Sequence, residues 1–326
     1  MIEVSATFWI GFLILVLFLL SLDMFVFHKK GERVKVKKAL WLSLFWISLA
    51  LMFNVGIYFV FGKESAIEFF TAYLIEESLS IDNLFVFIII FATFKIDLRY
   101  QHDVLFWGIL GAIIFRAIFI FAGVALIERF GWIMYIFGAF LAFTGLKMAI
   151  DLVRERKGKQ IEKVDISKNK IIRFFMKIIP TTDDISEVKF FKKIDGKLVA
   201  TPFFIALLVI EMTDIIFAVD SIPAVLSVST NTFIVYTSNI FAILGLRSFY
   251  FALRGIMDIF YYLKYTLSII LIFIGAKMIL NHHSEIVGSD FHISNATSLI
   301  VIASLLAISI VASILRSKHL KNKTHR

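Results

Sequence analysis

The sequence contains no cysteine, only three prolines and few charged residues. The absence of cysteine from all 326 residues excludes disulfides, thiolate zinc sites, iron–sulfur clusters and thiol catalysis. Charged side chains make up 18% of the chain and hydrophobic ones 60%, whereas soluble domains average about 25% and about 45–50%. Together with a mean hydropathy of +0.88, these proportions indicate an integral membrane protein.

Nine segments are long and apolar enough to cross a bilayer as helices. Crossing takes about 20 apolar residues, because a helix satisfies its own backbone polar groups where no water is available. The sequence therefore predicts an all-α, polytopic membrane helix bundle. The predicted spans are roughly 6–27, 39–61, 67–92, 104–127, 131–150, 202–226, 232–253, 261–280 and 294–315.

The distribution of lysine and arginine predicts the orientation of these spans. If the N-terminus lies outside, 28 of the 34 Lys and Arg residues fall in connections on the inner side. Cytoplasmic loops carry such an excess, so we expect an external N-terminus and a cytoplasmic C-terminus. The formal charge of +9 is then explained by loops facing the cytoplasm, without nucleic acid as a partner.

One long hydrophilic stretch, residues 151–201, divides the membrane part into two halves. Within it, residues 166–179 mix apolar and basic side chains, a composition typical of an amphipathic helix at the membrane surface; an ordinary cytoplasmic helix fits equally well. Further on, Asp195-Gly196 between short apolar and polar runs predicts a β-hairpin. We expect a small cytoplasmic subdomain here, not a catalytic domain.

The two halves contain similar groups of three spans. Gly145-Leu-Lys147-Met recurs as Gly275-Ala-Lys277-Met at an offset of 130 residues. Because three is odd, the second group enters the membrane from the opposite side, as in many secondary transporters. Chance similarity is the alternative, but most matched residues are charged, which lipid-facing helices seldom contain. The other matched pairs are Arg116 with Arg247, Asp82 with Asp214, and Glu77 with Glu211.

The repeat defines the expected division of the chain. Two leading spans occupy residues 1–66, and the first three-helix repeat occupies 67–150. The basic loop of 151–201 precedes the second, inverted repeat of 202–281, and a ninth helix with a basic tail occupies 282–326.

Ionisable residues within the predicted spans are candidates for function, because a charge at a helix centre costs about 2.5–3.5 kcal/mol on insertion scales. Asp23, near the cytoplasmic end of its span, is expected to reach water. The remaining acids exceed the bases by two charges, which one divalent cation or two protons would neutralise. Structural salt bridges with protonated surplus acids are the alternative. These residues are the acids Glu76, Glu77, Asp82, Glu211, Asp214 and Asp220 and the bases Arg116, Lys147, Arg247 and Lys277.

The types of ligand constrain the cation. Carboxylate, amide and hydroxyl oxygens suit magnesium, calcium and manganese, whereas zinc and copper favour thiolate or imidazole. His282 and His283 are expected in the external loop before the ninth span, where a solvated polar loop is favoured over a metal antenna. The expected auxiliary ligands are Ser80, Asn83, Ser221 and Asn239, and the four bases are expected to balance charge.

Convergence of the acids on one cavity requires irregular helices. Glu77 and Asp82 lie about 140° apart around an ideal helix. Pro223, directly after the second acidic cluster, is therefore expected to break its helix and free carbonyl ligands. The glycines Gly131, Gly138 and Gly145, spaced seven residues apart, predict close contact with another helix.

The longest motifs resemble the TerC/Alx family of bacterial membrane proteins. They are Glu77-Ser-Leu-Ser-Ile-Asp-Asn, Glu211-Met-Thr-Asp-Ile-Ile-Phe-Ala-Val-Asp-Ser-Ile-Pro and Tyr236-Thr-Ser-Asn-Ile-Phe-Ala-Ile-Leu-Gly-Leu-Arg247. The resemblance covers nearly the whole chain and implies manganese export at the inner membrane, with an older link to tellurite resistance. It maps the family's carboxylates onto the metal ligands Glu77, Asp82, Glu211, Asp214 and Asp220.

The leading hypothesis is therefore a transporter that exports Mn(II), with protons as a possible coupling ion, with no permanently bound cofactor and no enzymatic activity. A membrane scaffold or assembly factor for stress or secreted enzymes is the alternative, with partners docking on residues 151–201. Intramembrane proteolysis by Asp82 and Asp214 fits less well, because no further catalytic signature accompanies the two aspartates.

Overall fold

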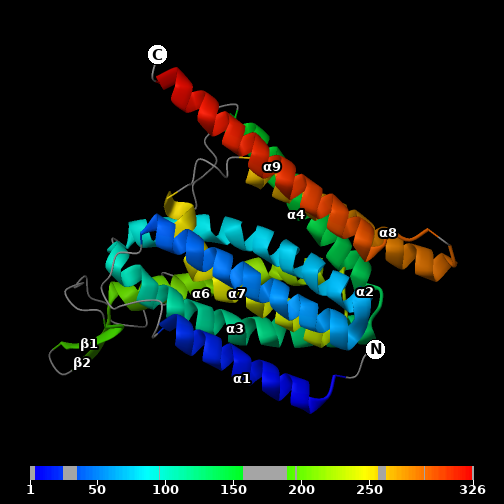
Figure 1. Ribbon diagram of the computed structural model, residues 1–326, viewed down its shortest axis with the longest axis horizontal. Helices are drawn as coiled ribbons and strands as arrows, with labels where there is room; N and C mark the ends of the chain where they lie inside the picture. The colour runs from blue at the N-terminus through cyan, green and yellow to red at the C-terminus, as the bar shows by residue number, and fades with distance from the viewer. Residues whose placement is uncertain are drawn as a thin grey trace.

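The computed structural model describes residues 4–24, 35–94, 96–156, 189–194, 197–255, 262–289 and 291–324. Helices make up nearly all of this part of the chain, and a two-stranded hairpin lies at one end of the bundle (Figure 1). The helices are α1 (Ala6–Leu22), α2 (Val36–Thr93), α3 (Leu98–Arg129), α4 (Ile133–Arg156), α6 (Pro202–Leu226), α7 (Thr232–Gly255), α8 (Leu263–Val287) and α9 (Asn295–Thr324). The strands are β1 (Phe191–Ile194) and β2 (Lys197–Ala200).

The long helix α2 folds back on itself at Gly62. This residue has φ 90° and ψ 177°, a conformation that glycine tolerates because it lacks a Cβ atom. The rings of Phe53 and Phe69 lie 5.6 Å apart, whereas a straight helix would separate these positions by about 24 Å. Residues 36–61 therefore form a first arm and residues 63–93 a second arm, which correspond to the second and third predicted spans.

Seven helices in the described part of the chain are long and apolar enough to cross a membrane, and α2 counts as one of them. The prediction of a polytopic helical membrane protein is confirmed at this level. The sixth predicted span coincides with α6, whereas α8 and α9 extend to Val287 and Thr324, beyond the predicted ends at 280 and 315. The remaining spans differ from the helices by up to six residues at an end. The helix α1 has only 17 residues, fewer than predicted and fewer than the about 20 that a crossing usually takes. The number of nine spans stays a prediction.

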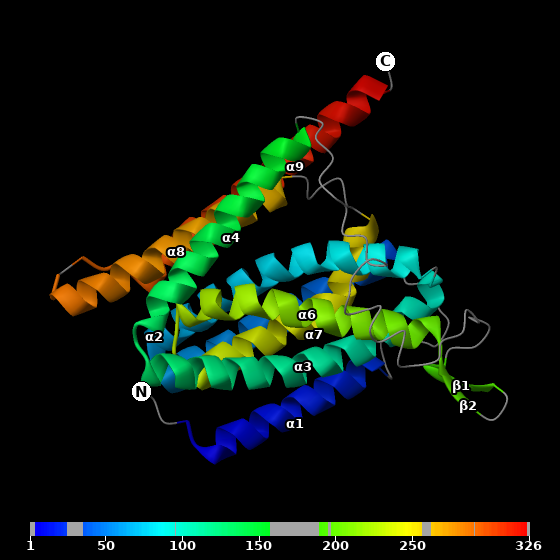
Figure 2. The ribbon, with the colours of Figure 1, turned by 180° about the vertical axis from the view of Figure 1, so that it is seen from behind.

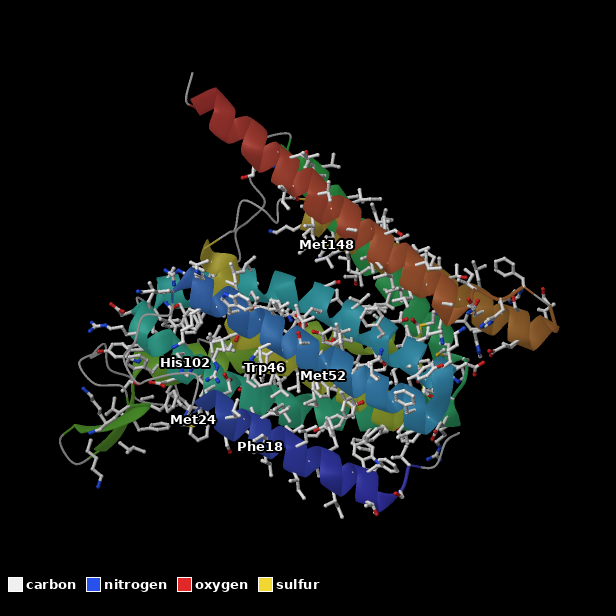
Figure 3. The ribbon with its side chains drawn as sticks, viewed as in Figure 1. Phe18, Met24, Trp46, Met52, His102 and Met148 are labelled. Atoms are coloured by element: carbon white, nitrogen blue, oxygen red, sulfur yellow. The ribbon has the colours of Figure 1, made fainter. Side chains whose placement is uncertain are left out.

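The helices pack mainly in pairs: α2 against α7, α3 against α6, and α4 against α8. Figures 1 and 2 show α4, α8 and α9 lying together and running obliquely to the other helices. Trp46 is 1% exposed on the bundle side of α2, whereas Phe18 on α1 is 60% exposed and points outward (Figure 3).

Glycine permits the close approach of α4 to α8. A Cβ atom on Gly138 would lie 2.9 Å from the backbone oxygen of Gly275, and one on Gly145 would lie 2.7 Å from the backbone oxygen of Ser268. The prediction that the glycines of α4 allow close helix contact is confirmed. Gly131 at the start of the same stripe lies against His282.

The predicted hairpin is also confirmed. Strands β1 and β2 pair antiparallel, with Phe191 opposite Ala200 and Ile194 opposite Lys197. The Phe191 ring packs on that of Phe204 at 4.5 Å, which joins the hairpin to the first turn of α6. The segment 166–179, predicted as an interfacial or cytoplasmic helix, lies outside the described residues.

The prediction that Pro223 breaks the sixth span is wrong. The helix α6 continues through Pro223 to Leu226, and Ser227 N donates to the carbonyl of Pro223 at 3.0 Å. The proline lies within one turn of the end of the helix, so it removes the hydrogen bond to the Val219 carbonyl without ending the helix. The acidic segment of α2 is likewise helical, and the interruption in that helix is at Gly62.

Candidate functional site

A buried arginine at the centre of the bundle joins carboxylates from the two halves of the chain. Arg116 of α3 is 1% exposed. Its Nη1 donates to Glu76 Oε2 at 2.5 Å, its Nη2 to Asp214 Oδ1 at 3.0 Å and its Nε to Asp214 Oδ2 at 3.3 Å. Glu76 and Asp214 are 0% and 3% exposed. We call these three residues the Arg116 cluster.

Three helices position the Arg116 cluster. Glu76 lies on the second arm of α2, and Asp214 lies on α6, which runs beside α3. Small residues on α3 let α6 approach: a methyl group added to Gly111 would overlap the Glu211 carboxylate. This close packing brings Asp214, one turn further along α6, level with Arg116.

Two more carboxylates lie close in sequence to members of the Arg116 cluster and have buried oxygens without a hydrogen-bond partner. Both oxygens of Glu77 are buried and unpaired, and so are Glu76 Oε1 and Glu211 Oε2. Glu77 follows Glu76 directly, and Glu211 lies three residues before Asp214 on the same helix face. Buried polar atoms normally have a partner, so these oxygens mark a place where a cation, water or proton is needed.

The auxiliary ligands predicted from the sequence are all buried. Asn239 on α7 is 0% exposed, and neither its Oδ1 nor its Nδ2 has a partner. Ser221 Oγ is likewise buried and unpaired. Ser80 and Asn83 are 3% and 4% exposed. These neutral oxygens are the kind that complete the coordination of hard cations.

The structure does not bring all five predicted metal ligands together. The side chains of Asp82 and Asp220 lie outside what is described. Among the described residues, no three His, Asp or Glu side chains converge closely enough to hold a metal ion. Glu211 and Asp214 share a face of α6, but Asp214 is engaged by Arg116. Arg116 therefore pairs with two of the central carboxylates, one from each half of the chain.

Arg247 pairs with Asp23 and not with the carboxylates whose charge it was expected to balance. The sequence placed Asp23 near water, but Asp23 is 2% exposed and forms an ion pair with Arg247. The guanidinium of Arg247 also lies 5.5 Å from the centre of the Phe106 ring. The prediction that Asp23 reaches solvent is wrong, because the end of α1 packs against α7 and covers this position.

The two lysines predicted to balance charge differ from each other. Lys147 on α4 is exposed, so it does not share the buried environment of the carboxylates. Lys277 on α8 is 2% exposed, and its Nζ donates to Asn295 Oδ1 at 2.8 Å. The charge of Lys277 also interacts with the Glu68 carboxylate. Glu68 was not among the predicted site residues, because it lies at the very start of a predicted span.

The two histidines that were expected in the external loop after the eighth span lie on a helix. His282 and His283 belong to the last turns of α8, which extends to Val287. The hydroxyl oxygen of Tyr135 on α4 lies 3.3 Å from His283 Nδ1. The Tyr135 ring also packs edge-on against the His282 ring, with the ring centres 4.9 Å apart. The prediction of a loop here is wrong, and these contacts give the histidines a packing role between α4 and α8.

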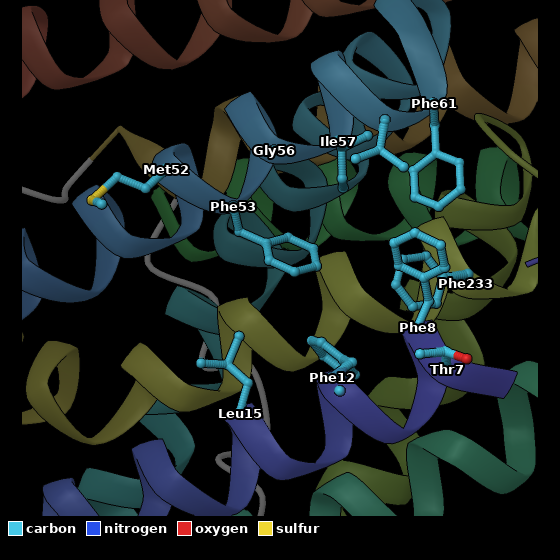
Figure 4. A pocket seen from close by; sticks show the side chains of 12 residues that line it. Thr7, Phe8, Phe12, Leu15, Met52, Phe53, Gly56, Ile57, Phe61 and Phe233 are labelled. Atoms are coloured by element: carbon cyan, nitrogen blue, oxygen red, sulfur yellow. The ribbon is translucent and has the colours of Figure 1, made fainter. Parts of the chain in front are cut away.

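An apolar pocket of about 440 Å³ lies between α1 and the first arm of α2 (Figure 4). Its lining includes Phe8, Phe12, Phe53 and Phe233, and the polar side chain among its lining residues is Thr7. A pocket without carboxylates cannot compensate the charge of a cation, so the Arg116 cluster remains the candidate site.

Sequence comparison places these buried charges within a known family. The sequence profile of the "Integral membrane protein TerC family" matches residues 61–321, a region that contains every member of the Arg116 cluster. The chain belongs to the TerC family. No solved structure matches this TerC-family protein.

Related proteins match along almost their whole length. An uncharacterized membrane protein of Myxococcus xanthus is 47% identical over 95% of this chain and 93% of its own. A Salmonella typhi protein named "Putative membrane-bound redox modulator Alx" is 41% identical over 93% of this chain and 92% of its own. The Escherichia coli protein of the same name is also 41% identical, over 93% of this chain and 92% of its own.

Proposed function

We propose that this protein exports a divalent cation, Mn(II), from the cytoplasm through a site at the Arg116 cluster. The observation that carries the proposal is the surplus of buried acid there. Glu76 and Asp214 share one guanidinium, Glu77 follows Glu76 directly, and Glu211 precedes Asp214 by about one helical turn. Several oxygens of Glu76, Glu77 and Glu211 are buried and have no partner. One divalent cation and one proton would neutralise this surplus, and desolvated carboxylates without such compensation are costly.

The chemistry of the ligands supports a hard cation. Carboxylates and the neutral oxygens of Asn239 and Ser221 suit manganese, magnesium or calcium. Among these, the TerC family resemblance selects manganese. The cation is substrate in this proposal, and we propose neither a resident cofactor nor an enzymatic reaction.

The contacts between α4 and α8 support an inverted repeat. Gly138 lies against Gly275, and Gly145 lies against Ser268. With the repeat offset of 130 residues, Gly138 corresponds to Ser268 and Gly145 corresponds to Gly275. Each contact therefore joins one of these positions to the repeat equivalent of the other. The two helices are thus antiparallel and exchange places under a two-fold rotation. An inverted repeat with a site between its halves favours alternating access.

Arg116 has a defined role in this mechanism. With no cation bound, its guanidinium holds Glu76 from the first half and Asp214 from the second. An arriving cation competes with arginine for these carboxylates, and the contact across the halves is then remade around the cation. Protons are the proposed exchange ion, because the buried carboxylates that Arg116 does not pair, those of Glu77 and Glu211, need another source of positive charge when the metal leaves.

Transport in proteoliposomes tests the proposal. Purified protein in vesicles of known orientation, loaded with a manganese-sensitive dye, should move Mn(II), and a pH gradient should alter the rate. We expect Asp214→Ala and Asp82→Ala to abolish the flux. The exposed acid Glu64 provides the matched control, since Glu64→Gln should transport normally. Unchanged flux in either aspartate variant would remove these residues from the site.

A scaffold function is the second candidate. The name of the Alx relatives, which describes them as membrane-bound redox modulators, favours a role other than transport. This chain has no cysteine, so thiol exchange cannot underlie such an effect here. Replacing residues 157–188 with a flexible linker separates the two ideas. A scaffold should lose its cellular phenotype, whereas a transporter should keep its flux in vesicles. We also propose an inner-membrane location with an external N-terminus, which accessibility labelling at both termini would test.

A further inference from the structure

A second, partly buried polar cluster joins the second arm of α2, the connection from α6 to α7, α8 and the start of α9. Lys277 donates to Asn295 Oδ1 at 2.8 Å, and Asn295 Nδ2 donates to the carbonyl of Val228 at 2.8 Å. Ser229 Oγ donates to Glu68 Oε2 at 2.7 Å, and the charges of Glu68 and Lys277 attract each other across the cluster. We call Glu68, Ser229, Lys277 and Asn295 the Lys277 cluster.

The Lys277 cluster joins the two halves of the chain. Glu68 begins the second arm of α2 in the first half, whereas Ser229 lies in the connection from α6 to α7 in the second half. Lys277 and Asn295 add α8 and α9 to the same contact. Glu68 precedes Glu76 by eight residues, which is about 12 Å along the helix. The cluster therefore lies between the Arg116 cluster and the membrane surface predicted to be external.

The opposite end of the bundle has its own contact between the halves. Gln101 of α3 accepts at Oε1 from the Tyr250 hydroxyl at 2.7 Å and from Arg254 Nη1 at 2.9 Å, both on α7. Gln101 and Tyr250 are 2% and 0% exposed. The Arg116 cluster thus lies between two polar contacts that each hold the first half against the second.

The Lys277 cluster is not simply one copy of a repeated structural feature. Lys147 aligns with Lys277 in the first repeat, yet Lys147 is exposed and Lys277 is 2% exposed. The lysine is buried only at the end that α9 covers. A buried ammonium is costly without partners, and Asn295 supplies one to Lys277 in this arrangement. Opening of the cluster would require water to replace this partner.

We propose that the Lys277 cluster is the outer gate of the cation path, an inference that rests on the proposed transport function. When closed, Lys277 repels a cation at the exit, and the bond from Ser229 to Glu68 keeps the halves together. When open, the Glu68 carboxylate is released from Ser229 and faces the departing divalent cation. Each transport cycle then requires Glu68 to separate from Ser229.

Cross-linking tests the gate, and the natural absence of cysteine gives a background free of other thiols. The variant Glu68→Cys with Ser229→Cys is reconstituted and treated with a short, reductant-cleavable bis-thiosulfonate. We expect Mn(II) flux to fall to the level of protein-free vesicles and to return on reduction. The control pair is Phe8→Cys with Phe61→Cys, whose rings lie 5.3 Å apart outside both repeats. Its cross-linking should leave the flux unchanged.

Charge exchange provides a second, independent readout. We expect Lys277→Glu alone to slow the flux and Lys277→Glu with Glu68→Lys to restore it, because the exchange rebuilds the attraction. Full flux through a cross-linked Glu68–Ser229 pair, verified by mass spectrometry, would overturn the gate while leaving transport intact. Absence of flux from wild-type vesicles would instead overturn the transport function itself.

Discussion

Removal of Arg116 is the sharpest test of how the centre of the bundle is held together. The substitution Arg116→Gln keeps a polar side chain of similar length but deletes the positive charge between Glu76 and Asp214. If those carboxylates are ionised and paired, the variant leaves two buried negative charges close together with no cation.

The expected loss of stability follows from the geometry. All three side chains are at most 5% exposed, and two separate carboxylates bind the guanidinium at 2.5 and 3.0 Å. Deleting one partner of a buried ion pair costs about 3–5 kcal/mol, mainly because the remaining charge is uncompensated. We expect the free energy of unfolding to fall by about 3 kcal/mol or more, since glutamine replaces some hydrogen bonds but no charge.

The triple variant Arg116→Gln, Glu76→Gln, Asp214→Asn isolates the electrostatic part of this loss. It removes every charge of the cluster while keeping its shape, and replacing a whole buried pair is often close to neutral. The triple variant should therefore be more stable than Arg116→Gln alone. Unfolding by SDS titration in mixed micelles, followed by tryptophan fluorescence, measures the difference.

The exposed Arg129 at the end of α3 provides the matched control. Arg129→Gln should change the free energy of unfolding by no more than about 0.5 kcal/mol, as surface substitutions usually do. If Arg116→Gln proves as stable as the triple variant, the carboxylates are not held as charged partners of arginine. The proposed competition between Arg116 and the cation would then be refuted.

Three further predictions concern close packing and buried hydrogen bonds. Gly275→Val should destabilise the protein by about 1–3 kcal/mol in the same titration, because its Cβ would lie 2.5 Å from a backbone oxygen of α4; unchanged stability would contradict the close crossing. Gly111→Ala should displace the Glu211 carboxylate and lower Mn(II) flux, whereas Gly11→Ala, with open space around it, should not. Gln101→Leu should cost about 1–3 kcal/mol by leaving the buried Tyr250 hydroxyl of α7 without this acceptor, and a smaller loss would show that water replaces the amide.

Much of the helical architecture was predictable from local sequence. The sixth predicted span coincides with α6, because Thr201-Pro202 begins an apolar run that is unbroken until Glu211. The hairpin at Asp195-Gly196 was also predicted, since a turn dipeptide between short alternating runs is a local signal. The effect of Pro223 was misjudged, because its position within the last turn matters more than its identity.

The partners of the buried charges were less predictable. Glu76 and Glu77 are adjacent in sequence, and only the rotation of α2 within the bundle decides that Glu76 meets Arg116. Asp23 was expected in water because it ends a span, yet the packing of α1 turns it toward Arg247. Glu68 was missed because its neighbours Ser229 and Lys277 come from the other half of the chain, and only the packing of the helices brings them near it.

Composition and periodicity alone determined that this protein spans a membrane, that its interior carries acid, and that thiol chemistry is absent. Those properties depend on which residues are present and on the cost of placing them in lipid. Tertiary structure alone decided that Arg116 joins Glu76 to Asp214 and that Lys277 is buried beneath α9. Hydrogen bonds and ion pairs act over a few ångströms, so their partners are set by how distant helices meet.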